Sequence, residues 1–318
     1  MPRTSFLFLV CWFLALGGMA RGMKKEEPVS TPSKPYENSH FLTVDSVLFH
    51  YREWNDTLGN PRGKVVLVHG FCGSSFSWRK NIEPLVRAGF RVITVDLPSF
   101  GYSGRYPDLN QSNSNRARLV WMLLTEIEGA DTTGWMVVGH SMGGGVAEAM
   151  AILEPARTRS LVIVDGMVFM KSSNLTNTAS AAGRNKYVHH FMVDIAKKNI
   201  ITYHRIDRLL KSAYGRPPDS TEVMGYLAPL LAEGTVESAF GVWTHSREIV
   251  KMDIGTLPRI PVLIVWVRKD PWIGKGKGER FHEAIPHSEL KIIPGRGHIP
   301  METHAEEFNR YLVEFLTR

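Results

Sequence analysis

The amino-acid sequence predicts an α/β fold, in which helices flank a mostly parallel central β-sheet and a helical cap is inserted late in the chain. Three observations predict it. Short β-branched apolar runs alternate with helical stretches, one run leads into a serine between two glycines, and a long interval interrupts the alternation. With 318 residues and 43% hydrophobic content, the chain is long enough for one large domain with an insertion.

Residues 1–20 are expected to form a secretory signal peptide. Arg3 is the only charged residue there, 6–16 is an unbroken apolar run, and small residues follow it. The run is short for a membrane span, which needs about 20 residues, although an uncleaved N-terminal anchor is the alternative. Residues 21–39 are polar and contain three prolines, which predicts a flexible leader. The mature protein is therefore expected to be secreted, periplasmic or in the lumen of the secretory pathway.

Export would leave the mature chain with a single cysteine. Cys11 lies in the expected signal, so only Cys72 remains and an intramolecular disulfide is excluded. Sequons begin at Asn55, Asn110 and Asn174, and they could carry glycans in a eukaryotic secretory pathway.

The charge distribution argues against a nucleic-acid partner. The formal net charge is +7, but the basic residues are dispersed, without a long basic run or a basic patch interleaved with aromatic residues. We expect no nucleic-acid partner and no specific membrane partner.

Residues 40–166 and 257–318 are predicted to form the α/β core. Alternating apolar and polar residues predict a hairpin from 40 to 54. Continuous apolar runs suit parallel strands buried on both faces; they lie at 65–68, 92–95, 136–138, 161–164, 262–265 and, more weakly, 290–293. Helices are expected at 77–88, 115–128, 142–153 and about 302–316.

Residues 167–256 are predicted to form the helical cap, because this interval is too long for a simple crossover between strands. Helical periodicity occurs at 189–197, 206–210 and 224–231. Large apolar residues of the cap are expected to line an apolar pocket: Phe169, Tyr187, Phe191, Met192, Tyr203 and Trp243.

The stretch Gly139-His140-Ser141-Met142-Gly143 is the strongest chemical signal. It follows an apolar run and opens a helix of small residues, so Ser141 is predicted at a sharp, strained turn from strand to helix. Its hydroxyl would then stand at the end of the sheet, beside a helix N-terminus that favours developing negative charge.

A base and an acid are expected at the same edge of the sheet. Asp270 follows the run at 262–267, and His298 follows the last predicted strand. The carboxyl ends of parallel strands share one edge, so Ser141, Asp270 and His298 can converge despite their separation. Asp165, at the end of the preceding strand, is the alternative acid. His304 is instead expected on the solvated face of the final helix.

These motifs resemble the α/β-hydrolase superfamily over nearly all of residues 40–318, including the chain order serine, aspartate, histidine. The segment His69-Gly70-Phe71 resembles the family's oxyanion loop, and residues 96–104 resemble its D-x-P-G-x-G-x-S turn. The resemblance implies that the backbone N–H groups of Phe71 and Met142 hold the oxyanion. The chain has Ser99 and Val267 where the family usually has glycine. Ser99 touches no catalytic role, whereas Val267 lies just before the acid loop and bears on its conformation.

Other polar residues are given structural roles. Asp96 is expected to bind its own turn, His69 to be structural, and Cys72 to pack or line the pocket. The cap histidines His189, His190 and His245 lack an accompanying carboxylate or cysteine cluster, so no metal site is expected.

The sequence therefore predicts an exported serine hydrolase that needs no cofactor or metal and acts on a small apolar ester. A thioesterase, an aminopeptidase or amidase, and a carbon–carbon bond hydrolase are the alternatives among enzymes. A ligand-binding, receptor-like protein that retains the triad is the alternative of another class. Serine at position 141 argues against dehalogenases and epoxide hydrolases of this fold, which need aspartate there.

Overall fold

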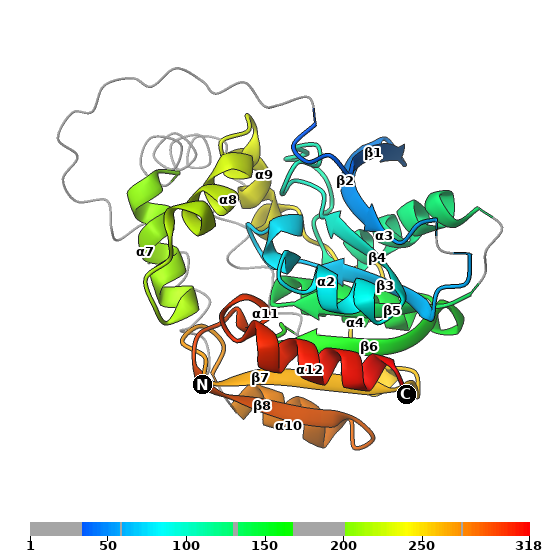
Figure 1. Cartoon of the computed structure of the whole chain (residues 1–318). Coiled ribbons are helices and arrows are strands. Elements are labelled where there is room, and N and C mark those ends of the chain that lie inside the picture. The colour runs from blue at the N-terminus through cyan, green and yellow to red at the C-terminus, as the bar shows by residue number, and fades with distance from the viewer. Residues whose placement is uncertain (1–33, 58, 130–132, 168–200, 275) are drawn as a thin grey trace, which may run out of the picture.

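The computed structural model describes residues 34–57, 59–129, 133–167, 201–274 and 276–318. Eight strands form one sheet in the order β1-β2-β4-β3-β5-β6-β7-β8 (Figure 1). The first two strands form an antiparallel hairpin that pairs antiparallel with β4, and the remaining neighbours are parallel. The strands are β1 (Ser39–Val44), β2 (Val47–Trp54), β3 (Gly63–Val68), β4 (Phe90–Asp96), β5 (Trp135–His140), β6 (Thr158–Val164), β7 (Val262–Lys269) and β8 (Glu289–Arg296). The predicted fold class is confirmed.

The central strands are buried on both faces because helices cover the sheet from both sides. Val66 and Val68 of β3 belong to one apolar core, and Val65 and Leu67 belong to the other. The first core contains side chains of α3 (Asn113–Glu128), α4 (Met142–Leu153) and α10 (Gly276–Ala284). The second contains those of α2 (Ile82–Arg87) and α12 (Ala305–Leu316).

Two predicted helices differ in their boundaries. The stretch at 77–88 divides into a 3-10 turn, η1 (Ser75–Trp78), and α2. The predicted final helix divides into α11 (Pro300–Thr303) and α12, because His304, at φ −127°, leaves the helical conformation. His304 therefore lies at a junction, partly buried, and not on a solvated helix face as predicted.

The cap contributes three helices: α7 (Tyr203–Tyr214), α8 (Ser220–Leu230) and α9 (Thr235–Thr244). They lie beyond the carboxyl ends of the parallel strands, on the side to which the strand arrows point (Figure 1). The predicted helical segments 206–210 and 224–231 fall in α7 and at α8, whereas 189–197 lies outside the described residues. The start of α8 is fixed by a capping box between Asp219 and Glu222.

A buried polar cluster joins the cap to the core. The carboxylate of Glu302, in α11, accepts hydrogen bonds from the hydroxyls of Tyr214 (2.6 Å) and Tyr226 (2.5 Å), and it pairs with Arg79. Burial raises the pKa of Glu302, while Arg79 and the two hydroxyls oppose this shift. Two cap helices are thus tied to a helix that begins two residues after His298.

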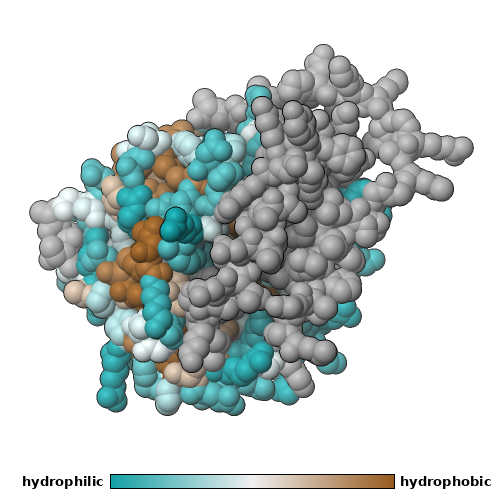
Figure 2. All heavy atoms as spheres, turned by 180° about the vertical axis from the view of Figure 1, so that it is seen from behind, coloured by the Kyte–Doolittle hydropathy of each residue, from teal (hydrophilic) through white to brown (hydrophobic). Residues whose placement is uncertain are grey.

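Among the described residues, none of the helices combines the length and hydropathy needed to cross a membrane. From behind, hydrophobic spheres lie in small groups among hydrophilic ones (Figure 2). In the described part of the chain, the large apolar side chains that are more than a third exposed come from several different elements: Phe41, Leu48, Tyr203, Met224, Leu231 and Ile249.

Two of the sequons have amides engaged with the backbone. Asn55 Nδ2 donates to the carbonyls of Val86 (3.2 Å) and Phe90 (2.9 Å). Asn110 Nδ2 donates to the carbonyl of Arg247 at 2.7 Å. A glycan leaves one N–H on the amide, so at Asn55 it would remove at least one of these bonds. The third sequon, at Asn174, lies outside the described residues.

Candidate active site

Ser141 lies at the turn between β5 and α4, in a strained backbone conformation. Its φ of 51° and ψ of −120° are unusual for a residue other than glycine. The turn closes only with a small residue before it, because a β-carbon on Gly139 would lie 2.1 Å from the carbonyl oxygen of Gly143. The local sequence thus holds the Ser141 side chain at the carboxyl end of β5.

Ser141, His298 and Asp270 form one hydrogen-bonded line. His298 Nε2 lies 2.9 Å from Ser141 Oγ, and His298 Nδ1 lies 2.8 Å from Asp270 Oδ2. The carboxylate accepts the Nδ1–H, which leaves Nε2 as the acceptor for the serine hydroxyl. The other oxygen of Asp270 accepts the N–H groups of Trp272 (2.7 Å) and Ile273 (3.0 Å), which fix the carboxylate in its loop. All three side chains are buried.

Asp165, the alternative acid, lies beside Asp270 but not in this line. Its Oδ1 accepts the N–H of Val267 at 3.0 Å, and among the described residues no donor faces its Oδ2. Burial and the neighbouring Asp270 carboxylate raise the pKa of Asp165 well above its usual range. Val267 stands where the family usually has glycine. Its backbone N–H donates to Asp165 as that of a glycine would, so the substitution keeps this hydrogen bond.

The loop that contains Phe71 passes directly against the serine. A β-carbon on Gly70 would lie 3.1 Å from Ser141 Cβ and 2.9 Å from His140 Nδ1. Met142 is the first residue of α4, so its N–H has no acceptor within the helix. The two predicted oxyanion residues therefore flank the serine from different elements.

His69 and Asp96 support this loop. His69 Nδ1–H donates to the carbonyl of Gly70 at 2.7 Å, and its Nε2 accepts the N–H of Leu97 at 2.9 Å. Burial lowers the pKa of His69, in keeping with this neutral form. The buried Asp96 carboxylate accepts the N–H groups of Ser75 (2.5 Å) and Tyr102 (2.8 Å). His69 and Asp96 thus hold the backbone of the loops around them, as predicted for structural residues.

Ser99 adopts the left-handed conformation that glycine would take in this turn, with φ 75°. Its hydroxyl accepts the side-chain N–H of Gln111 at 2.8 Å. The hydroxyl thus gives the turn a link that a glycine would lack.

His140, next to the serine, is not among the predicted site residues. Its Nε2–H donates to the carbonyl of His298 at 2.7 Å, and the two rings lie 4.9 Å apart. Burial and the nearby His298 lower the pKa of His140 well below its usual value, so the ring is neutral. No local sequence pattern signals this role, because the contact joins residues 158 positions apart.

Trp272 and the end of α7 also contact the histidine. The Trp272 ring lies 4.9 Å from that of His298, and its Nε1–H donates to Ser212 Oγ at 3.2 Å. The backbone N–H of His298 donates to the carbonyl of Ala213 at 2.6 Å. The cap therefore contacts both the acid loop and the base loop.

The predicted pocket residues are only partly visible. Tyr203 is 46% exposed, and the structure does not describe the side chain of Trp243. The other four, Phe169, Tyr187, Phe191 and Met192, lie outside the described residues. Cys72 is partly buried, and burial raises the pKa of its thiol to about 12, so it stays protonated at neutral pH.

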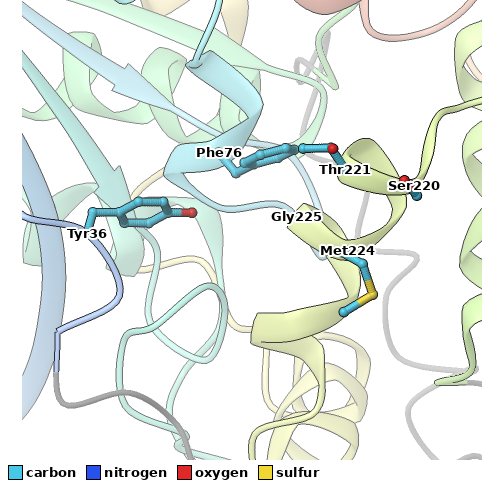
Figure 3. A pocket seen from close by; sticks show the side chains of 6 residues that line it. All are labelled: Tyr36, Phe76, Ser220, Thr221, Met224 and Gly225. Carbon is cyan, nitrogen blue, oxygen red and sulfur yellow. The ribbon is translucent and has the colours of Figure 1, made fainter.

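A groove of about 400 Å³ lies where the cap meets the core, between the η1 turn and α8. Phe76 reaches toward α8, and Tyr36 lies on the opposite side (Figure 3). None of Ser141, Asp270 and His298 lines it. Across the described part of the chain, no three His, Cys, Asp or Glu side chains group as they would around a metal ion.

Comparison with known proteins gives matches over most of the chain. A family model described as alpha/beta hydrolase fold matches residues 64–305. "Uncharacterized hydrolase YugF" of Bacillus subtilis is 27% identical over 290 residues, covering 86% of this chain and 96% of that protein. A "2-hydroxy-6-oxononadienedioate/2-hydroxy-6-oxononatrienedioate hydrolase" of Cupriavidus pinatubonensis is 27% identical over 296 residues, covering 87% and 95%. The structure of a serine hydrolase involved in carbazole degradation superposes with a TM-score of 0.68 at 21% identity, covering 88% and 98%.

Proposed function

Because this chain belongs to the alpha/beta hydrolase fold family, and several of its relatives are named hydrolases, we propose that it is a serine hydrolase acting on carboxylic esters. The observation that carries the proposal is the hydrogen-bonded line from Ser141 Oγ through His298 to Asp270. Nucleophile, base and orienting carboxylate are the parts that acyl transfer requires.

The first half of the reaction forms an acyl-enzyme. His298 Nε2 takes the proton of Ser141 as Oγ attacks the ester carbonyl carbon, and the carbonyl oxygen becomes an oxyanion. The N–H groups of Phe71 and Met142 donate to that oxygen. Loss of one such donor costs about 3 kcal/mol of transition-state stabilisation, or roughly 100-fold in rate. The intermediate collapses, and the alkoxide leaves as an alcohol with the proton from His298.

The second half returns the enzyme to its starting state. His298 takes a proton from water, and the hydroxide attacks the acyl carbon. The new oxyanion collapses, and the bond to Ser141 Oγ breaks as Oγ regains the proton from His298. The products are a carboxylic acid and free enzyme, with no external electron donor or acceptor. Asp270 keeps the imidazolium oriented throughout.

Hydrolysis of a carbon–carbon bond is the second candidate. The relatives named as 2-hydroxy-6-oxononadienedioate hydrolases favour it, because a 2-hydroxy-6-oxo dienoate is the substrate given in their names. The two reactions differ in the leaving group, which is an alcohol in one case and a carbanion in the other. Turnover of p-nitrophenyl esters without cleavage of a 2-hydroxy-6-oxo dienoate supports the ester proposal, and the reverse result supports the second candidate.

The decisive experiment labels the nucleophile. A fluorophosphonate probe should label the wild type and His304→Ala, but not Ser141→Ala. Turnover of a panel of ester, thioester and amide substrates, with Ser141→Ala as the blank, then identifies the bond that is cleaved. Labelling once per molecule without steady turnover would favour the receptor-like alternative. Folded wild-type protein that neither labels nor turns over any ester contradicts the proposal.

Export is a separate part of the proposal. It rests on the charged start, apolar run and small residues of 1–20. The mature protein is expected to begin near residue 21 in the exported fraction, as N-terminal sequencing would show. Full-length chain held in the membrane fraction would instead support the uncleaved anchor.

A further inference from the structure

Arg116 is a fully buried cation that the mechanism above does not use. It lies in α3 with 0% exposure, and burial lowers its pKa to about 9, so it stays charged at neutral pH. Its hydrogen bonds within the described residues go to neutral groups, Gln111 Oε1 at 2.7 Å and Met142 Sδ at 3.1 Å. No partner there faces its Nε. Burying a cation is costly, and the nearby Glu248 carboxylate offsets only part of the effect of burial on the pKa of Arg116.

The guanidinium links the two sides of the proposed oxyanion hole. On one side it donates directly to the side chain of Met142, whose backbone N–H is one proposed donor. On the other side it lies 5.3 Å from the ring centre of Phe100. The Phe100 ring packs edge-to-face against Phe71, the second proposed donor, at 5.3 Å and 71°.

Gln111 adds a third link. Its Oε1 accepts from Arg116, and its Nε2 donates to Ser99 Oγ (2.8 Å) and to the carbonyl of Tyr106 (2.9 Å). The guanidinium is therefore joined to the turn that follows β4 as well as to α4. A planar group with several fixed donors can bridge such partners at once, whereas the single ammonium of lysine cannot hold the same geometry.

We propose that Arg116 is a positioning residue for the oxyanion hole, holding Met142 and Phe71 at the spacing that the developing oxyanion needs. The inference rests on the proposed acyl-transfer function. Because the oxyanion exists only in the transition state and the intermediates, the effect falls on kcat and not on KM.

Arg116→Met tests this inference with p-nitrophenyl butyrate as substrate. We expect kcat to fall about tenfold, which is about 1.4 kcal/mol, while KM changes less than about twofold. Inhibition by butylboronic acid, which forms a tetrahedral adduct with serine, should weaken by a similar factor. A merely structural role would not move kcat and boronate affinity together at constant KM.

The same helix offers a matched control. Arg118 donates to a methionine sulfur at the same distance, Met122 Sδ at 3.1 Å, and pairs with Asp45 at the surface. Arg118→Met should leave kcat, KM and boronate affinity at wild-type values. An equal loss of kcat in this variant overturns the inference.

Met142→Leu tests the contact even where Arg116→Met fails to fold, because it removes the sulfur acceptor and keeps the volume. We expect Met142→Leu to lower kcat at constant KM. We expect the kcat of Arg116→Lys to lie between those of the wild type and Arg116→Met. The double variant Arg116→Lys with Met142→Leu should cost less than the product of the two single losses. If the fold-loss of kcat in the double variant equals the product of the two single fold-losses, the inference is overturned.

The proposed function is tested separately by the wild type and Ser141→Ala. If the wild type turns over the ester and Ser141→Ala does not, the function stands. Unchanged kcat and boronate affinity in Arg116→Met then contradict the role of Arg116 alone. A higher KM with unchanged kcat has the same consequence.

Discussion

The backbone N–H of His298 donates a 2.6 Å hydrogen bond to the carbonyl oxygen of Ala213, at the C-terminal end of α7. This bond joins the proposed base to the cap. Gly215 ends the same helix with φ 70°, and a β-carbon there would lie 2.5 Å from the carbonyl oxygen of Arg296. The position of the cap and the position of the base loop are therefore coupled.

Gly215→Ala should disturb the base through this coupling. The added methyl group must displace either the 296–298 loop or the end of α7, so we expect kcat to fall about tenfold or more. Gly129→Ala is the matched control, because Gly129 also has positive φ (59°) but nothing within 4 Å of its β-carbon position. Both variants add backbone strain, and Gly129 (ψ −115°) lies further from the left-handed region than Gly215 (ψ 6°), so thermal unfolding should show that Gly129→Ala loses at least as much stability to strain. Equal activity in both variants would contradict the coupling.

Asp270→Asn and Asp165→Asn should separate the two carboxylates by activity. Asn at 270 no longer holds His298 in the required tautomer, and the comparable change in a serine protease costs about 10⁴-fold in kcat. Asp165→Asn keeps the Oδ1 acceptor for Val267, so its loss should stay below about tenfold. Steady-state kinetics on one ester decides the matter. A larger loss from Asp165→Asn would make that residue the acid.

Asp165 should also impose a pH dependence on stability. Its pKa is raised in the folded state, so the folded protein binds more protons than the unfolded chain between the unfolded value, about 3.9, and the raised value. The free energy of unfolding contributed by this group therefore falls as pH rises through that window. Asp165→Asn removes the penalty, and its advantage over the wild type should grow from pH 4 upward. Urea unfolding at several pH values measures this, with the exposed Asp56→Asn as control. A difference independent of pH would show that the carboxyl is not shifted in this way.

Tyr226→Phe should loosen the attachment of the cap. The variant removes the hydroxyl that donates to Glu302 and contacts Ser77 Oγ at 3.0 Å. A hydrogen bond to a charged group is worth about 1.5–3 kcal/mol, so the unfolding free energy should fall by that amount. Tyr203→Phe, on an exposed ring of the same cap, should change it by less than about 0.5 kcal/mol. Denaturant unfolding of both variants makes the comparison, and equal values would mean that the Glu302 cluster does not hold the cap.

Some elements could not be predicted from local sequence. The helix α9 and the helix α10 were not predicted, and α10 carries glycines at 276 and 278 and few apolar residues. A β-carbon on Gly278 would lie 2.8 Å from the Trp266 ring, so close packing against β7 selects the residue there. Tertiary contacts, not helix propensity, decide such segments.

The sequence by itself determined the fold class and the turn at Ser141, because both depend on short-range patterns. Apolar runs specify buried strands, and glycines beside the serine allow strand and helix to approach. It also placed Asp270 and His298 at the correct edge, since parallel strands end at the same side of a sheet.

Only the tertiary structure decided which carboxylate meets the histidine. Asp165 and Asp270 follow neighbouring strands, and either could reach the same edge. The loop after β7 turns so that Trp272 and Ile273 hold Asp270 against His298 Nδ1. The contacts of His140, Ala213 and Arg116 were likewise invisible in the sequence. They join elements distant along the chain, and such contacts are set by how whole layers pack, not by any local pattern.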